Sequence, residues 1–128
     1  MDDLASLDAT AQAELVRSGD ASPLELVDAA IARIEKLNPE LGAVIHPLFD
    51  RARRAAAAEL PDGPFRGVPT LVKDLDGYLA GAPYHAGNKL LKQLDYRPDT
   101  TSYLFEKLEA AGFVITGKTN TPEFGLLP

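Results

Sequence analysis

The chain has 128 residues, enough for one small domain with a hydrophobic core. Hydrophobic residues make up 45% and charged residues 25%, an ordinary composition for a globular protein. The net charge is −6 and the acidic excess lies in the first half, so no basic stripe favours nucleic acid or an anionic membrane surface. The absence of cysteine excludes disulfides and thiolate metal sites, and His46 and His85 lie far apart without ligand spacing.

The first residues, "MDDLASLDAT", are acidic and have no hydrophobic segment, unlike a signal peptide. No apolar run approaches the length needed to span a membrane. We therefore expect a cytoplasmic protein without membrane association.

Two helices are predicted in the first forty residues. Segment 8–18 has Asp8 as its N-cap. The second helix, over 23–37, begins at a capping box formed by Ser22 and Glu25, with a proline in its first position. We expect it to end at the Asn-Pro pair that follows.

The middle of the chain mixes extended and helical signals. Residues 41–49 are expected to be extended or irregular, and the alanine-rich segment 50–60 is predicted to be a helix capped by Asp50. A strand is predicted over 68–73. The stretch 74–99 is punctuated by glycine and proline, and loops of this length are uncommon unless they are functional.

The last thirty residues predict one helix and one strand. The helix covers about 100–111, capped by Asp99 or Thr100, and the strand covers 113–116. The final stretch, "GKTNTPEFGLLP", has the composition of turns and loops. The order of elements indicates a piece of an α/β layered fold, and with only two clear strands we expect the fold to be incomplete.

Residues 112–119 match the phosphate-loop pattern G-x-x-x-x-G-K-[ST]. That loop requires a strand before its first glycine and a helix opening at its end. Here a predicted helix precedes Gly112, the intervening residues are β-formers, and Pro122 follows where an early helical hydrogen bond is needed. We therefore interpret the segment as a helix–strand–turn connection and not as a nucleotide site.

Lys73, at the end of the strand predicted over 68–73, is the main candidate for chemistry. Alternation places Lys73 with Leu71 on one face and Val72 on the other. By spacing alone, a lysine that packs its stem and extends its ammonium to water beside Asp74 is favoured. The functional alternative is a lysine held neutral in a dry site, where it would be a general base for a serine hydroxyl. A close Asp74 would oppose this unless it points elsewhere.

Other candidates are weaker. Lys118 is expected to be solvated or bonded to a turn, and His85 is expected in a loop. Asp74 and Asp76, as a pair beside a glycine, are typical of the start of a loop. All serines lie near predicted helix ends, and none lies in a glycine-rich turn that would present a nucleophile.

Two sequence blocks and the leading helix pair carry a resemblance. "GPFRGVPTLVKDL" (63–75) and "DTTSYLFEKLEAAGFVITGKTNTPEFG" (99–125) resemble, in order and spacing, the N-terminal part of the amidase signature family. The chain looks most similar to the aminohexanoate cyclic-dimer hydrolase type and related bacterial amidases. The resemblance implies an α/β fold with a mixed β-sheet flanked by helices. Residues 1–128 would be the N-terminal part of one amidase domain, with a helical region over 8–60 and the start of the sheet core over 64–128.

The same resemblance implies hydrolysis of a small-molecule amide by a Ser–cis-Ser–Lys triad, without metal or organic cofactor. The catalytic role carries over to Lys73, and an oxyanion hole of backbone amides would stabilise the tetrahedral intermediate. Gly125 and Leu126 would contact the substrate, and Leu126 would favour an uncharged, apolar portion of it.

The family places both triad serines and the oxyanion amides in a glycine- and serine-rich segment, which would follow residue 128. We therefore expect these 128 residues to be an N-terminal fragment that hydrolyses no amide by itself. Two alternatives stay open. The chain could be a non-catalytic helical segment for interaction or homodimerisation, or part of an amidotransferase subunit of the glutamyl-tRNA type.

Overall fold

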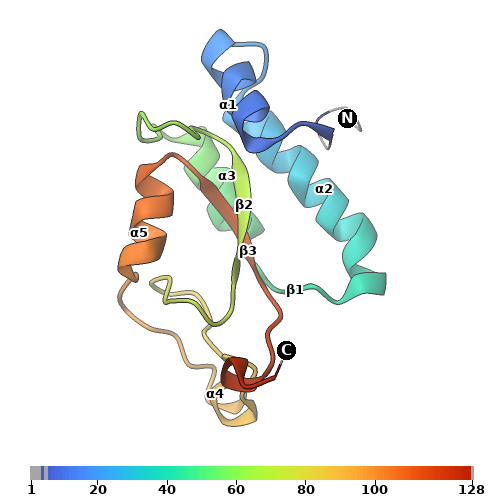
Figure 1. The fold of residues 1–128 in the computed structure, drawn as a ribbon, viewed down its shortest axis with the longest axis vertical. Helices are drawn as coiled ribbons and strands as arrows, with labels where there is room; N and C mark the ends of the chain where they lie inside the picture. The colour runs from blue at the N-terminus through green and yellow to red at the C-terminus, as the bar shows by residue number, and fades with distance from the viewer. Residues whose placement is uncertain (1–3, 5, 128) are drawn as a thin grey trace.

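The computed structural model describes residue 4 and residues 6–127. The three described strands form a small sheet that is flanked by helices (Figure 1). The elements are α1 (Ala9–Ser18), α2 (Pro23–Leu41), β1 (Val44–Pro47), α3 (Phe49–Ala57), β2 (Pro69–Lys73), α4 (Lys89–Gln93), α5 (Tyr103–Ala110), β3 (Val114–Thr119) and the 3₁₀ turn η2 (Glu123–Gly125).

The sheet has the strand order β1-β3-β2. The central strand β3 is antiparallel to β1 and parallel to β2, so the sheet is mixed. Helices α2 and α5 lie on opposite sides of it (Figure 1). On one side the core joins α2, α3 and β3, and on the other it joins β2, β3, α5 and the loop after β2. The predicted fold class, a mixed sheet flanked by helices, is confirmed.

Both N-terminal helix starts are confirmed. The Asp8 carboxylate accepts a hydrogen bond of 2.8 Å from the Ala11 N–H. At the start of α2, the Ser22 hydroxyl accepts from the Glu25 N–H and the Glu25 carboxylate accepts from the Ser22 N–H. The reciprocal bonds satisfy two backbone donors that a helix start otherwise leaves unpaired.

The predicted end of α2 is wrong, because the helix continues through Pro39 to Leu41. In the last turn a proline forfeits only one backbone hydrogen bond, so it need not end the helix. Termination comes instead from Gly42, which is left-handed and donates to the Asn38 carbonyl at 2.8 Å. The Asn38 side chain then binds both the N–H and the carbonyl of Val44. No helix in the described part of the chain is long and apolar enough to cross a membrane.

Two predicted helix caps are also wrong. Asp50 lies inside the first turn of α3, whose N-cap is Leu48 without a side-chain bond. Helix α5 starts after Ser102, and neither Asp99 nor Thr100 caps it. The Ser102 hydroxyl accepts a backbone N–H from the loop after β2 and so ties the start of α5 to that loop.

The sheet is larger than predicted. The segment predicted as extended or irregular contributes β1, and β3 continues through Gly117, Lys118 and Thr119, whose composition predicts a turn. Pairing on both sides satisfies the backbone of β3 and outweighs the weak β propensity of this segment. The phosphate-loop pattern therefore lies largely within a strand, where the loop motif would require a loop. Helix α4 interrupts the long stretch predicted as a loop.

Gly112 and Gly19 offer a matched test of packing at the start of β3. Both have left-handed backbones, with φ of 96° and 81°. A Cβ at Gly112 would lie 2.5 Å from the Arg66 Cα, whereas a Cβ at Gly19 would meet nothing within 4 Å. We expect Gly112→Ala to lower the free energy of unfolding by about 3 kcal/mol, against about 1 kcal/mol for Gly19→Ala, in urea denaturation. Equal losses would contradict this close approach.

Candidate active site

Lys73 is the last residue of β2 and is partly buried. Its neighbour Val72 packs into the core on the α5 side, whereas Leu71 is 38% exposed, as the predicted alternation requires. Within the described residues, the Lys73 side chain makes no hydrogen bond and no ion pair, although its backbone pairs with β3. Its amine is therefore not engaged by any described group.

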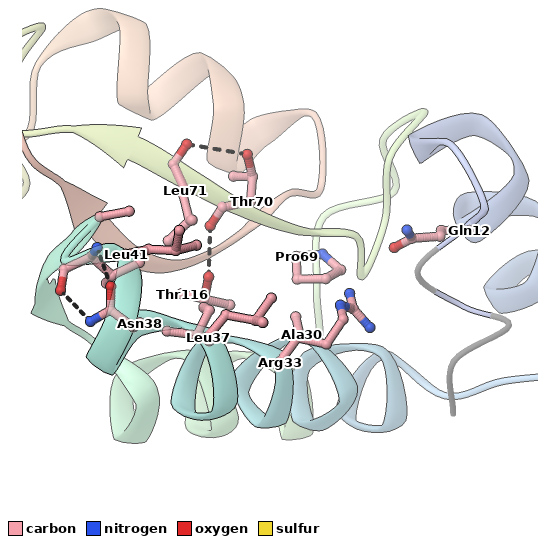
Figure 2. A pocket seen from close by; sticks show the side chains of 13 residues that line it. Gln12, Ala30, Arg33, Leu37, Asn38, Leu41, Pro69, Thr70, Leu71 and Thr116 are labelled. Atoms are coloured by element: carbon pink, nitrogen blue, oxygen red, sulfur yellow. Dashed lines mark hydrogen bonds between the residues drawn. The ribbon is translucent and has the colours of Figure 1, made fainter.

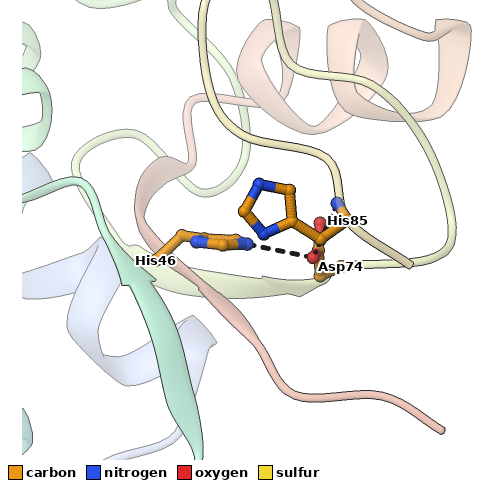
Figure 3. Close-up of side chains that lie close together, drawn as sticks. All are labelled: His46, Asp74 and His85. Carbon is orange, nitrogen blue, oxygen red and sulfur yellow. Dashed lines mark hydrogen bonds and ion pairs between the residues drawn. The ribbon is translucent and has the colours of Figure 1, made fainter. Parts of the chain in front are cut away.

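Asp74, the next residue, is fully buried and points to a different set of partners. One carboxylate oxygen accepts a hydrogen bond of 2.6 Å from the Lys118 ammonium of β3. The other oxygen accepts from His46 Nε2 of β1 at 3.0 Å (Figure 3) and from the backbone N–H of His85 at 3.1 Å. Asp74 is thus bound by groups from two other strands and from the loop that follows β2.

Lys118 is completely buried, which contradicts the expectation of a solvated or turn-bonded lysine. Because β3 extends past Gly117, the Lys118 side chain enters the core, where it also donates to the Pro83 carbonyl at 2.7 Å. Its ammonium lies 5.0 Å from the centre of the Tyr84 ring. Burial lowers the pKa of Lys118, and the contact with Asp74 opposes this.

The electrostatics favour an ionised Asp74 and a neutral His85. Burial alone would raise the pKa of Asp74, but the hydrogen bonds from His46 and Lys118, with the charge of Lys118, hold it below its ordinary value. Burial and the neighbouring His46 lower the pKa of His85. The buried His85 Nε2 has no hydrogen-bond partner in the described part of the chain.

His46, Asp74 and His85 form the one group of possible metal ligands among the described residues, with ligand atoms within 4.8 Å. Sequence spacing indicates no ligand set for the two histidines, yet their ring centres are 4.6 Å apart. The carboxylate, however, is already balanced by the Lys118 ammonium, and His46 binds its second oxygen. A divalent cation would have to displace these contacts, so the arrangement fits a buried ion-pair network better than a metal centre.

The two predicted substrate contacts lie differently. Gly125 belongs to η2, and a Cβ on it would be 2.9 Å from the Leu75 side chain. Gly125 therefore packs against Leu75, which follows Lys73 by two residues. Leu126 is 76% exposed. The structure therefore brings Gly125 to the end of β2 and leaves Leu126 on the surface, and both roles stay predictions.

Hydrogen bonds hold the C-terminal turn against the loop after β2, and both segments have strained backbone. Ala86 and Phe124 both have positive φ, 49° and 48°, although neither is glycine. The Phe124 N–H donates to the Ala86 carbonyl at 2.8 Å, and the Asn88 amide donates to the Glu123 carboxylate at 2.8 Å. Such strain persists only where surrounding contacts impose it, and it concentrates at functional sites.

An apolar groove of about 350 Å³ lies elsewhere, between α2 and β2 (Figure 2). It is lined by Leu37 and Leu41 of α2 and by Pro69 and Leu71 of β2, among others. Neither Lys73 nor any member of the Asp74 network lines it. The groove is therefore separate from the candidate site.

The Asp74 network predicts a specific pH dependence of stability. Because the folded-state pKa of Asp74 is depressed, its contribution is present above the ordinary value of about 4 and is lost as the pH falls through the folded value. We expect Asp74→Asn to be less stable than wild type at pH 7 by about 3 kcal/mol, with this difference shrinking toward pH 3, in urea denaturation. The exposed Asp76→Asn is the matched control. A constant difference between Asp74→Asn and wild type across this range would contradict the network.

Comparison with known proteins supports a family assignment. A family model described as Amidase matches residues 25–128. The chain is 52% identical to 6-aminohexanoate-cyclic-dimer hydrolase of Paenarthrobacter ureafaciens over 92% of its own length and 24% of the relative. It is 40% identical to one subunit of the glutamyl-tRNA(Gln) amidotransferase of Salinispora tropica, covering 98% of this chain and 26% of that protein.

Solved structures agree. The structure of 6-aminohexanoate cyclic dimer hydrolase complexed with substrate superposes with a TM-score of 0.85 at 50% identity, over 92% of this chain and 24% of that one. A bacterial aryl acylamidase of the amidase signature family gives a TM-score of 0.81 at 31% identity, over 92% and 26%. The chain spans about a quarter of the length of the relatives it matches. It belongs to the amidase signature family and corresponds to the N-terminal part of its members.

Proposed function

We propose that the protein containing this chain is an amidase that hydrolyses a carboxylic amide C–N bond, with Lys73 as the general base of a Ser–cis-Ser–Lys triad. The observation that carries the proposal is the contrast between Lys73, unengaged at the end of β2, and Asp74, whose oxygens are both occupied. Membership of the amidase family supplies the reaction class.

The chemistry requires a lysine that can be neutral. Neutral Lys73 would accept a proton from the middle serine, which in turn would deprotonate the nucleophilic serine as it attacks the carbonyl. A carboxylate paired with Lys73 would hold the lysine in its charged form. In the structure the adjacent Asp74 is paired with Lys118 instead.

The serines of the triad would come from outside the described residues. The hydroxyls of Ser18 and Ser22 make local bonds at helix ends, and the Ser102 hydroxyl accepts a backbone N–H from the loop after β2, so these three are not presented as nucleophiles. We therefore propose that the 128 residues alone hydrolyse no amide.

The substrate would be a small amide. The 52% identity to a hydrolase named for the 6-aminohexanoate cyclic dimer favours an uncharged amide with an aliphatic portion. Gly125, packed on Leu75, and the exposed apolar Leu126 would contact that portion. The exposure of Leu126 is consistent with a surface that a substrate or another part of the protein covers.

A second candidate is an amidotransferase subunit. The 40% identity to the glutamyl-tRNA(Gln) amidotransferase protein favours it, although less strongly than the 52% identity favours a hydrolase. Hydrolysis of a simple amide by the purified complete protein, without partner subunits, would favour the hydrolase.

A serine-reactive fluorophosphonate probe on the complete protein tests the role of Lys73. We expect Lys73→Ala to slow labelling by about 10²–10⁴-fold, because the serine then has no base. The exposed Lys36→Ala should label like wild type. Equal labelling of wild type and Lys73→Ala would exclude Lys73 as the base.

A further inference from the structure

We propose that Lys118 and Asp74 are a positioning pair for Lys73: Lys118 neutralises and holds the Asp74 carboxylate, so that Lys73 keeps no counter-ion. The inference rests on the proposed function, and it assigns both residues to a role in which neither touches the substrate. Lys118, in the "GKTN" segment, therefore has a positioning role, and Lys73 has the role of the base.

The backbone fixes the direction of both side chains. The Asp74 N–H donates to the Thr119 carbonyl at 3.0 Å, so the pairing of β2 with β3 continues one residue past Lys73. Adjacent residues of a paired strand direct their side chains to opposite faces. Asp74 consequently enters the interior on the side of Val72, and Lys73 is directed to the other side.

The existing hydrogen bonds of Asp74 and Lys118 leave neither side chain available to pair with Lys73. The Asp74 carboxylate accepts three hydrogen bonds, at 2.6, 3.0 and 3.1 Å, from Lys118, His46 and the His85 N–H. Lys118 divides its ammonium between Asp74 and the Pro83 carbonyl, with both side chains fully buried. Neither partner can turn toward Lys73 without breaking buried bonds to a charged group, which is costly.

Among the described residues, Lys118 is the cation that pairs with Asp74, and Lys89 and Lys92 lie farther out, where they line a pocket with His46 and His85. The titratable groups that face Asp74 and Lys118 are His46 from β1 and Tyr84 and His85 from the loop after β2. Helix α5 packs on the same side of the sheet through the apolar Phe105. Without Lys118, a buried carboxylate one residue from Lys73 would lack its cation and would favour the charged form of Lys73.

The experiment measures the rate of fluorophosphonate labelling against pH in the complete protein, for three variants. The acidic limb of each profile is the pH range in which labelling slows as the pH falls. In Lys118→Met, the hydrogen bonds from the His46 ring and the His85 backbone N–H remain to keep Asp74 ionised. We expect the acidic limb to move up by about one pH unit, which makes labelling about tenfold slower at pH values below the limb. In Asp74→Asn, where the cation is left alone, the limb moves down. In the double variant Asp74→Asn/Lys118→Met the charges balance again, and the limb returns to its wild-type position.

The exposed Lys36→Met removes the same charge from α2 and should leave the limb unmoved. A merely structural pair would lower labelling equally at every pH, and the double variant would not restore the profile. Limbs at the wild-type position in both Lys118→Met and Asp74→Asn overturn the inference. If Lys118→Met does not fold, Asp74→Asn and the double variant decide by the same criterion.

A failure of the proposed function would give a different result from a failure of the positioning role. If Lys73→Ala labels like wild type, Lys73 is not the base. If Lys73→Ala loses labelling while the limb stays fixed in the Asp74 and Lys118 variants, the function stands and the positioning role is wrong.

Discussion

The buried ion pair between Asp74 and Lys118 is the interaction on which the arrangement of the candidate site depends. It joins the end of β2 to β3, and His46 adds β1, so one carboxylate ties together all three strands of the sheet. A buried charge is tolerated only when it is paired and hydrogen-bonded, and here both conditions are met. The interior position of Asp74 in turn places Lys73 on the opposite face.

The remaining elements support this junction from outside. Helices α2 and α3 cover one side of β3, and α5 with the loop after β2 covers the other. That loop carries Pro83 and His85, which complete the contacts of Lys118 and Asp74. Figure 1 shows the C-terminal turn η2 beside α4, and the hydrogen bond from the Asn88 amide to the Glu123 carboxylate joins the two. The long glycine- and proline-punctuated stretch therefore serves the ion pair directly.

Sequence reasoning succeeded where the signal was local. The capping box at Ser22 and the opposite facing of Leu71 and Val72 depend on neighbours within a few positions, and both predictions were confirmed. The predicted alternation does not extend to Thr70, because the strand register shifts between Thr70 and Leu71. The two family blocks correctly indicated the amidase family. Prediction from the sequence failed where pairing between distant segments determines the structure. The strand β1 and the second half of β3 have weak strand signals, and they form because β3 pairs on both sides. The burial of Lys118 and the meeting of His46 with His85 follow from that pairing, so spacing could not reveal them. The sequence did contain one signal for this network, namely the adjacency of Asp74 to Lys73. If Lys73 is to act as a base, the neighbouring carboxylate must pair with some other group.

In the proposed function, Asp74 is turned away from Lys73, and Lys73 can then serve as the base. A crystal structure of the complete protein, with a fluorophosphonate on its reactive serine, tests this most directly. We expect Lys73 Nζ within about 3.2 Å of a serine hydroxyl, with the Asp74 carboxylate still bound to Lys118. A structure in which Lys73 pairs with Asp74, or in which no serine lies within reach of Lys73, would contradict it.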